Sequence, residues 1–238
     1  MGLRGVAAAI AVAALCGISG QVWRSGAPAL AAENRTSGFV TVAGHRMFYE
    51  CSGAGSPTVV LEAGSPHPST TWRWVQPQIA RRTRVCAYDR AGLGRSAPPP
   101  RGHRTPRTQV RDLRLMLAAA KISGPYVVVG HSWGGLLARL FAHAYPVQTA
   151  GVVLLDATTF PYLMPARARR LRRKTNREGI DIAAAVARSD AIKSLGVLPL
   201  VVLGSNKPRL GAKLLAAQDA EAALSTDSVN AIARLSTH

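Results

Sequence analysis

Apolar and polar positions along the chain predict strands and helices in turn. Segment 38–51, GFVTVAGHRMFYEC, has two short alternating runs around a glycine turn, which is typical of a β-hairpin. The β-branched run 58–64, TVVLEAG, is of the kind buried on both faces of a sheet. Further strands are predicted at 83–90, 126–130, 151–157 and 198–204, with helices at 72–82, 107–122 and 135–146. This alternation predicts an α/β domain with a mostly parallel sheet and helices on both faces.

Two segments of the second half differ from this pattern. Residues 157–195 are basic, irregular and partly helical, and they lie between two predicted strands, so we expect an insert that covers a site as a lid. Residues 209–238 are predicted to be mainly helical, after which the sequence stops. The predicted domain comprises residues 33–238, with 157–195 as its insert.

The first residues are typical of a targeting signal. A positive start, an apolar core and a small-residue exit with Ala29 and Ala31 predict a secretory signal peptide over residues 1–32. The apolar run is shorter than the ~20 residues that span a bilayer, although retention in the membrane stays open. We therefore expect a secreted or cell-envelope protein.

Two cysteines follow this signal, Cys51 and Cys86. An even pair in an exported protein is consistent with a disulfide, but two buried thiols on neighbouring strands would give the same sequence. The spacing does not choose between them, because a bridge depends on geometry.

The net charge of the chain indicates which kinds of partner it could bind. The chain has 30 Lys and Arg against 12 Asp and Glu, a net charge of +18. Such an excess favours nucleic acid or an anionic cell-envelope surface as a partner. The one dense cluster, residues 167–177, has no interleaved aromatic residues that could stack on bases, which disfavours nucleic acid. A solvated surface and an anion site both remain open for this cluster.

The segment 124–146, GPYVVVGHSWGGLLARLFAHAYP, places Ser132 between Gly130 and Gly134, after a predicted strand and before a predicted helix. A serine on a sharp strand-to-helix turn exposes its hydroxyl at a helix N-terminus, where backbone N–H groups favour negative charge. This context favours a nucleophile. The alternative is a glycine-rich helix start without chemistry.

With this segment, the stretches 44–64, 74–96 and 151–157 make the sequence resemble the α/β-hydrolase superfamily from about residue 38 onward. The resemblance implies an eight-stranded sheet and hydrolysis of a small carboxylic ester, or a related acyl compound, through an acyl-enzyme. It implies no metal and no organic cofactor.

Carried over residue by residue, the resemblance makes Ser132 the nucleophile and the N–H groups of Trp133 and Ser65 the oxyanion hole. Asp156 is the expected acid; the other position that the family uses holds Asn206, whose amide cannot stabilise an imidazolium by charge. The alternative role for Asp156 is a helix cap. His67 is interpreted as a loop residue and Asp89 as a brace for a loop.

The resemblance places the catalytic base, a histidine, in a loop after the last strand. The histidines are at 45, 67, 103, 131, 143 and 238, and the last of them ends the helix expected before that strand. We therefore predict that the last strand and the base are missing, so that activity is weak or lost. Rescue by His238 stays open if the tail folds back.

Two other functions are compatible with the same residues. One is a non-catalytic binding protein that uses the pocket of this fold, since a fold hosts many functions. The other is a basic surface protein that binds polyanions through its net charge of +18.

Overall fold

The computed structural model describes residues 34–99, 104–158, 178–181, 184–185, 188, 191–205 and 211–233. Within them, one sheet contains eight strands: β1 (Thr36–Val42), β2 (His45–Ser52), β3 (Thr58–Glu62), β4 (Val85–Tyr88), β5 (Tyr126–His131), β6 (Thr149–Leu155), β7 (Leu200–Ser205) and β8 (Ser228–Ala233). The α-helices are α3 (Gln76–Ala80), α4 (Pro106–Ala119), α5 (Trp133–Ala144) and α9 (Gly211–Ala222), and two 3₁₀ turns are η1 (Ser69–Trp72) and η2 (Pro146–Gln148).

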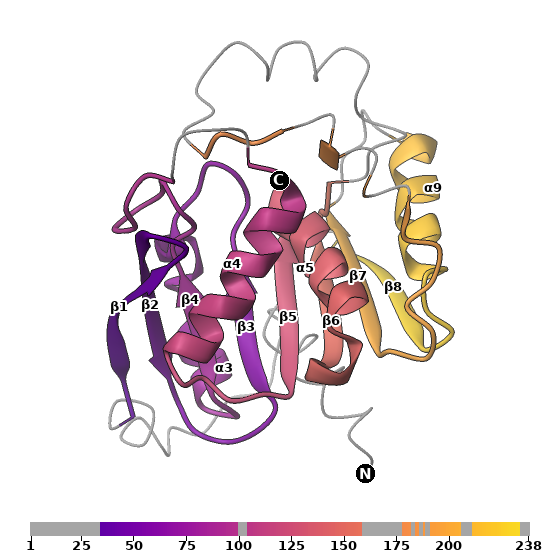
Figure 1. Cartoon of the computed structure of the whole chain (residues 1–238). Coiled ribbons are helices and arrows are strands. Elements are labelled where there is room, and N and C mark those ends of the chain that lie inside the picture. The colour runs from indigo at the N-terminus through magenta and orange to yellow at the C-terminus, as the bar shows by residue number, and fades with distance from the viewer. Residues whose placement is uncertain are drawn as a thin grey trace.

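The strands follow the order β1-β2-β4-β3-β5-β6-β7-β8 (Figure 1). Strand β2 pairs antiparallel with β1 and with β4, and the other neighbours pair in parallel. Parallel neighbours need crossover connections, and these bring helices onto the faces of the sheet. The predicted hairpin and the predicted α/β-hydrolase fold with a mostly parallel sheet are confirmed.

The prediction that the last strand is missing is wrong. Ser228–Ala233 forms β8, which lies beside β7 at the edge of the sheet, and α9 ends earlier, at Ala222. Val229 and Ile232 on β8 are 50% and 42% exposed. An edge strand that is open to solvent does not need the continuous apolar run that marks the central strands. Its short mixed pattern therefore resembled the end of a helix.

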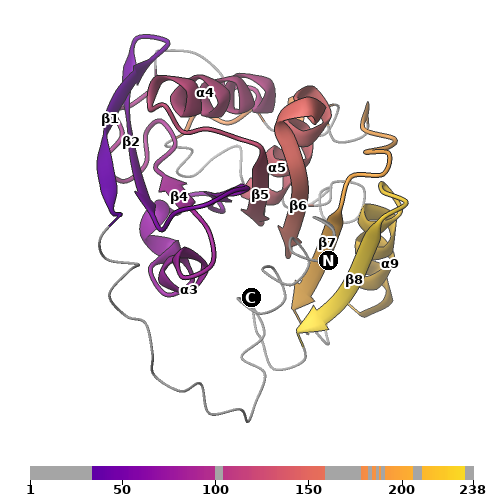
Figure 2. The ribbon, with the colours of Figure 1, turned by 90° about the horizontal axis from the view of Figure 1, so that it is seen from below.

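Helices cover both faces of the sheet (Figures 1 and 2). Helices α4, α5 and α9 lie on one face, where Leu113, Phe141 and Ala222 join one buried cluster. The other face is covered by η1 and α3, where Trp72 and Ile79 join a second cluster. These two apolar layers hold the sheet and fix the strand ends that form the site.

A disulfide joins Cys51 on β2 to Cys86 on β4. The two residues are directly opposite in the antiparallel register, and both side chains are buried. Of the two alternatives that the spacing left open, the structure has the bridge.

Several sequence predictions concern residues outside the described part. The signal peptide, residues 1–32, the basic cluster 167–177 and most of the insert lie there, so these remain predictions. Residues 178–181 of the insert are described and pair with Arg104 through a parallel bridge at Ile180. None of the helices within the described ranges is long and apolar enough to cross a membrane.

Candidate active site

Ser132 stands at the junction of β5 and α5, in a backbone conformation that few residues adopt. Its φ is 51° and its ψ is −116°. A non-glycine residue with positive φ costs about 1–3 kcal/mol and persists only where its surroundings enforce it. The structure thus has a sharp strand-to-helix turn at Ser132, where the sequence predicted one.

Glycines around Ser132 make the sharp turn sterically feasible. A Cβ added to Gly130 would lie 2.7 Å from Gly135 Cα, and one added to Gly134 would lie 2.7 Å from Ala63 O. Real Cβ atoms do not approach backbone atoms so closely. The strand, the helix and the turn after β3 can meet only because these positions lack side chains.

Backbone hydrogen bonds attach the turn to the end of β6. Ser132 N donates to Leu155 O at 3.0 Å, and Thr158 N donates to Ser132 O at 2.9 Å. Both contacts flank Asp156, which follows the last residue of β6 and is half-buried. The nucleophile candidate and the acid candidate are thus brought together at the carboxyl edge of the sheet, where ligands of open α/β sheets bind.

Asp156 is held by the next strand. Its φ is 43°, its N–H donates to Leu203 O at 2.9 Å, and its Oδ1 accepts from Ser205 N at 2.7 Å. A carboxylate oxygen held this way fixes the side chain at the edge of β7. The alternative acid position, Asn206, lies outside the described residues.

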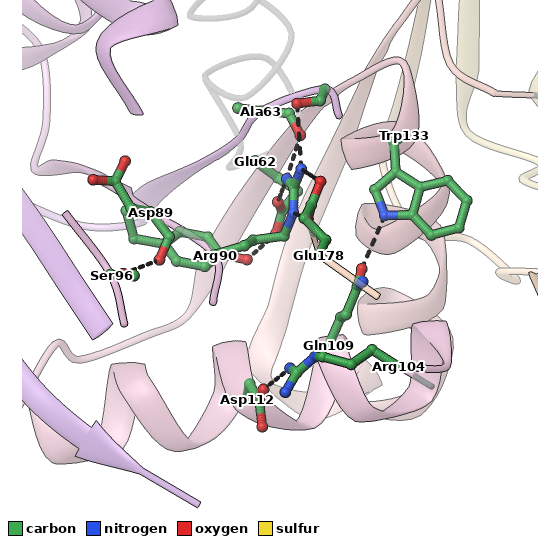
Figure 3. Close-up of polar contacts among 12 residues, drawn as sticks. Glu62, Ala63, Asp89, Arg90, Ser96, Arg104, Gln109, Asp112, Trp133 and Glu178 are labelled. Carbon is green, nitrogen blue, oxygen red and sulfur yellow. Dashed lines mark hydrogen bonds and ion pairs between the residues drawn. The ribbon is translucent and has the colours of Figure 1, made fainter. Parts of the chain in front are cut away.

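The expected oxyanion-hole residues lie on either side of the nucleophile. Trp133 is the first residue of α5, where helix N–H groups point out of the N-terminus, and its indole donates to Gln109 Oε1 at 2.9 Å (Figure 3). Ser65 lies in the turn after β3 and is exposed. Gly64 before it packs against the nucleophile, since an added Cβ would lie 3.2 Å from Ser132 Cβ.

Sequence reasoning missed a buried ion network beneath this turn. Arg90, after β4, contacts the carboxylates of Glu62 and Glu178, each at 2.6 Å, and Figure 3 shows the three side chains meeting below Ala63. Tyr88 also donates to Glu62. Burial raises the pKa of Glu62, and the charge of Arg90 partly opposes this. Burial lowers the pKa of Arg90, but Glu178 and Glu62 outweigh it, so that pKa is raised overall.

A second buried ion pair lies near Asp156. We call this the acid side of Ser132, and we call the side of Gly64 and Ser65 the oxyanion side. Arg139 on α5 donates to Thr158 O at 3.2 Å and lies 3.5 Å from Glu221 Oε1 on α9. Burial raises the pKa of Glu221 to about 7; Arg139 opposes this shift and Asp156 adds to it. The site therefore holds a carboxyl group that titrates near neutral pH and is sensitive to the charge of Asp156.

The described histidines occupy varied positions. His67 is an exposed loop residue, as interpreted, and its N–H donates to Gly64 O at 2.8 Å. His143 is exposed at the end of α5, and His45 is buried at the start of β2, 3.5 Å from Asp112. His103 and His238 lie outside the described residues.

Asp89 has the bracing role that was predicted. Its carboxylate accepts from Ser69 N at 2.7 Å and from Arg95 N at 2.8 Å. Both oxygens thus hold loop backbone. Across the described ranges, no group of three His, Cys, Asp or Glu side chains could hold a metal ion.

The fold defines a class of α/β proteins with a mostly parallel sheet, and the sharp turn at Ser132 lies at the carboxyl edge of that sheet. The family model described as "Alpha/beta hydrolase family" matches residues 59–235, and the chain belongs to this family.

Curated relatives carry several names. The chain is 32% identical over 163 residues to "Uncharacterized protein YqjL" of Bacillus subtilis (65% of this chain, 64% of that protein). It is 41% identical over 102 residues to "Soluble epoxide hydrolase" of Corynebacterium sp. (42% and 34%), and 30% identical over 126 residues to "Haloalkane dehalogenase" of Sphingobium indicum (52% and 42%). The matches thus span less than two thirds of each relative.

Among solved structures, a thermophilic esterase from Thermogutta terrifontis is similar, with a TM-score of 0.65 and 21% identity. The match covers 83% of this chain and 89% of that one. At this identity the likeness shows the shared fold.

Proposed function

We propose that the protein is a serine hydrolase that cleaves a carboxylic ester, or a related acyl compound, through an acyl-enzyme on Ser132. The observation that carries this proposal is the strained φ of 51° at Ser132, at the start of α5 and against Gly64. Strain that presents a single hydroxyl beside two candidate N–H donors is expected of a nucleophile.

The chemistry of a serine favours acyl substrates over those named for the relatives. Attack of a serine oxygen on an epoxide or haloalkane carbon would leave an ether on the enzyme, which water does not readily cleave. Attack on an acyl carbon leaves an ester, which water does cleave, so that turnover is completed. The identity of the residue at 132 therefore points to ester hydrolysis.

The steps follow from this arrangement. A base takes the proton of Ser132 as its oxygen attacks the carbonyl carbon, and the N–H groups of Ser65 and Trp133 stabilise the oxyanion. The base returns the proton to the departing alcohol, and water then attacks the acyl group in the same way. Asp156 orients the base and stabilises its positive form.

We propose that the base is His238. The expectation of a missing base depended on a missing last strand, and this strand is present as β8. Ala233 at the end of β8 pairs with Ser205, whose N–H binds Asp156. The five positions from Ala233 to His238 span up to about 17 Å when extended. The distance from β8 to β5 across three strand spacings is about 14 Å. The segment after β8 is therefore long enough for His238 to serve as the base for Ser132.

We also propose that the protein is exported. The signal-like pattern of residues 1–32 and the Cys51–Cys86 disulfide both support this, because disulfides persist in oxidising compartments.

Labelling with a fluorophosphonate probe tests the proposed function. The wild-type chain should be labelled on Ser132, Ser132→Ala should not be labelled, and His238→Ala should be labelled at least about 100-fold more slowly. Ser37→Ala on β1 and His143→Ala on α5, both exposed, are the matched controls and should behave as wild type. A wild-type chain that neither reacts nor hydrolyses p-nitrophenyl acetate would instead support a non-catalytic binding protein.

A further inference from the structure

Arg90 uses all of its hydrogen-bonding capacity beneath the turn that follows β3. Nε and Nη2 donate to Glu178 at 2.6 and 3.1 Å, and Nη1 donates to Glu62 at 2.6 Å. Nη1 also donates to Ala63 O, and Nη2 donates to Gly64 O at 3.2 Å. A guanidinium has five N–H donors, and these contacts employ five.

The contact with Gly64 O determines the direction of the next N–H. This carbonyl accepts from Arg90 and also from His67 N at 2.8 Å. The peptide from Gly64 to Ser65 is trans, and in a planar trans peptide the C=O and the following N–H point in opposite directions. The Ser65 N–H is therefore directed away from Arg90.

Gly64 lies in contact with both Arg90 and the nucleophile. Its carbonyl binds the guanidinium, while its Cα faces the Ser132 turn, where an added Cβ would lie 2.9 Å from His131 Nδ1. Rotation of this peptide would break two hydrogen bonds and leave a buried guanidinium N–H without an acceptor, which is unfavourable because water cannot replace the lost partner. The hydrogen bonds to Gly64 O thus oppose a change in the direction of the Ser65 N–H.

The surrounding charges keep the guanidinium in place. Arg90 is 4% exposed, and its carboxylate partners Glu62 and Glu178 are 0% and 2% exposed. Glu178 comes from the described stretch 178–181 of the insert, far from Arg90 in sequence. Removal of one partner from such a buried set leaves an uncompensated charge.

We propose that Arg90 is a positioning residue for the oxyanion hole: it holds the carbonyls of Ala63 and Gly64 so that the N–H of Ser65 stays directed at the oxyanion. The proposal rests on the proposed ester hydrolysis. Arg90 touches no reacting atom and acts through the peptide between Gly64 and Ser65.

The conservative variant Arg90→Lys tests this. A lysine keeps the charge but has three donors on one atom, so that it cannot satisfy five acceptors. With p-nitrophenyl acetate as substrate, we expect kcat to fall by about 100-fold, as for loss of one oxyanion donor, with KM within about threefold. Hydrogen exchange of the His67 amide, which donates to Gly64 O, should be at least about tenfold faster than in wild type, because rotation of the Gly64 carbonyl breaks this hydrogen bond. The exchange measurement does not depend on activity.

Arg104→Lys is the matched control, because Arg104 forms an ion pair with Asp112 on α4 and does not contact the turn after β3 (Figure 3). It should leave kcat and His67 exchange unchanged. If Arg90→Lys does not fold, Glu178→Gln replaces it; this change neutralises one carboxylate while keeping its size, and we expect a loss in kcat of about tenfold with faster His67 exchange.

The outcomes separate the two proposals. Arg90 variants whose kcat and His67 exchange match those of Arg104→Lys would overturn the positioning role. A wild-type chain without labelling at Ser132 would overturn the proposed function alone, and His67 exchange would then decide the role of Arg90. Equal losses in Arg90→Lys and Arg104→Lys would show a general structural effect and would also overturn the proposal.

Discussion

Arg90 and Arg139 are both buried near the Ser132 turn, one on each side, and their surroundings differ. On the oxyanion side, Arg90 makes contacts as short as 2.6 Å with two carboxylates and also binds two carbonyls. On the acid side, Arg139 lies 3.5 Å from Glu221, whose pKa is raised to about 7. Directional hydrogen bonds thus dominate one side and the balance of charge dominates the other. Changes of shape should damage the first, and changes of charge the second.

The largest effect is expected from Asp156→Asn, which changes charge on the acid side. Asparagine keeps a side-chain oxygen that can accept from Ser205 N, so the backbone of the site should be preserved. The loss of the negative charge beside the base should lower kcat by about 10³–10⁴-fold, measured with p-nitrophenyl acetate.

Asp181→Asn controls for the amide substitution, because Asp181 Oδ1 also accepts a backbone N–H, from Ala184 at 3.0 Å. It should leave kcat unchanged. If Asp156→Asn retained kcat within about tenfold of wild type, Asp156 would be a cap for backbone N–H groups and the acid would lie elsewhere.

Gly134→Ala changes shape on the oxyanion side. The added Cβ would lie 2.7 Å from Ala63 O, one of the carbonyls that Arg90 binds, and closer still to Glu62 O. Backbone atoms cannot yield as a flexible side chain can, so the turn after β3 should move away from Ser132. We expect kcat to fall by about 100-fold or more and the free energy of unfolding to fall by about 1–3 kcal/mol.

The control for this glycine is Gly38→Ala on β1, where an added Cβ would lie 3.5 Å from its nearest neighbour, Tyr49 Oη. This is ordinary van der Waals contact, and kcat should not change. Wild-type kcat in Gly134→Ala would mean that the turn after β3 supplies no oxyanion donor.

Local signals account for what the sequence could predict. The run before Ser132 and the glycines around it predicted the strand, the turn and the helix, because the steric needs of the turn lie within a few residues. The position of the candidate acid Asp156 was also local, because the resemblance implies an acid directly after the buried run that forms β6. The sequence also contained Glu62 inside an apolar strand, and a buried charge needs a partner.

Long-range partners could not be predicted in this way. Arg90 and Glu178 are 88 positions apart and meet only because the insert returns to the sheet beside β3. Strand β8 was missed for a different reason: its pairing with β7 depends on backbone contacts that its exposed side chains do not reveal.

Glu221→Gln tests the charge balance of the acid side with the smallest expected effect. The folded-state pKa of Glu221 is about 7 against an ordinary value of 4.5, so the folded state binds this proton more tightly than the unfolded state. The associated stability is present below pH 4.5 and is lost as the pH rises through 7. The loss amounts to at most about 3 kcal/mol.

Urea denaturation between pH 4.5 and 8 should show this decline in wild type and in Glu50→Gln, a control from an ion pair on β2, but not in Glu221→Gln. Asp156→Asn should shift the decline to lower pH, because the charge of Asp156 contributes to the raised pKa. An unchanged pH dependence in Glu221→Gln would show that the carboxyl group does not titrate near neutral pH and that the two sides of Ser132 differ in shape alone.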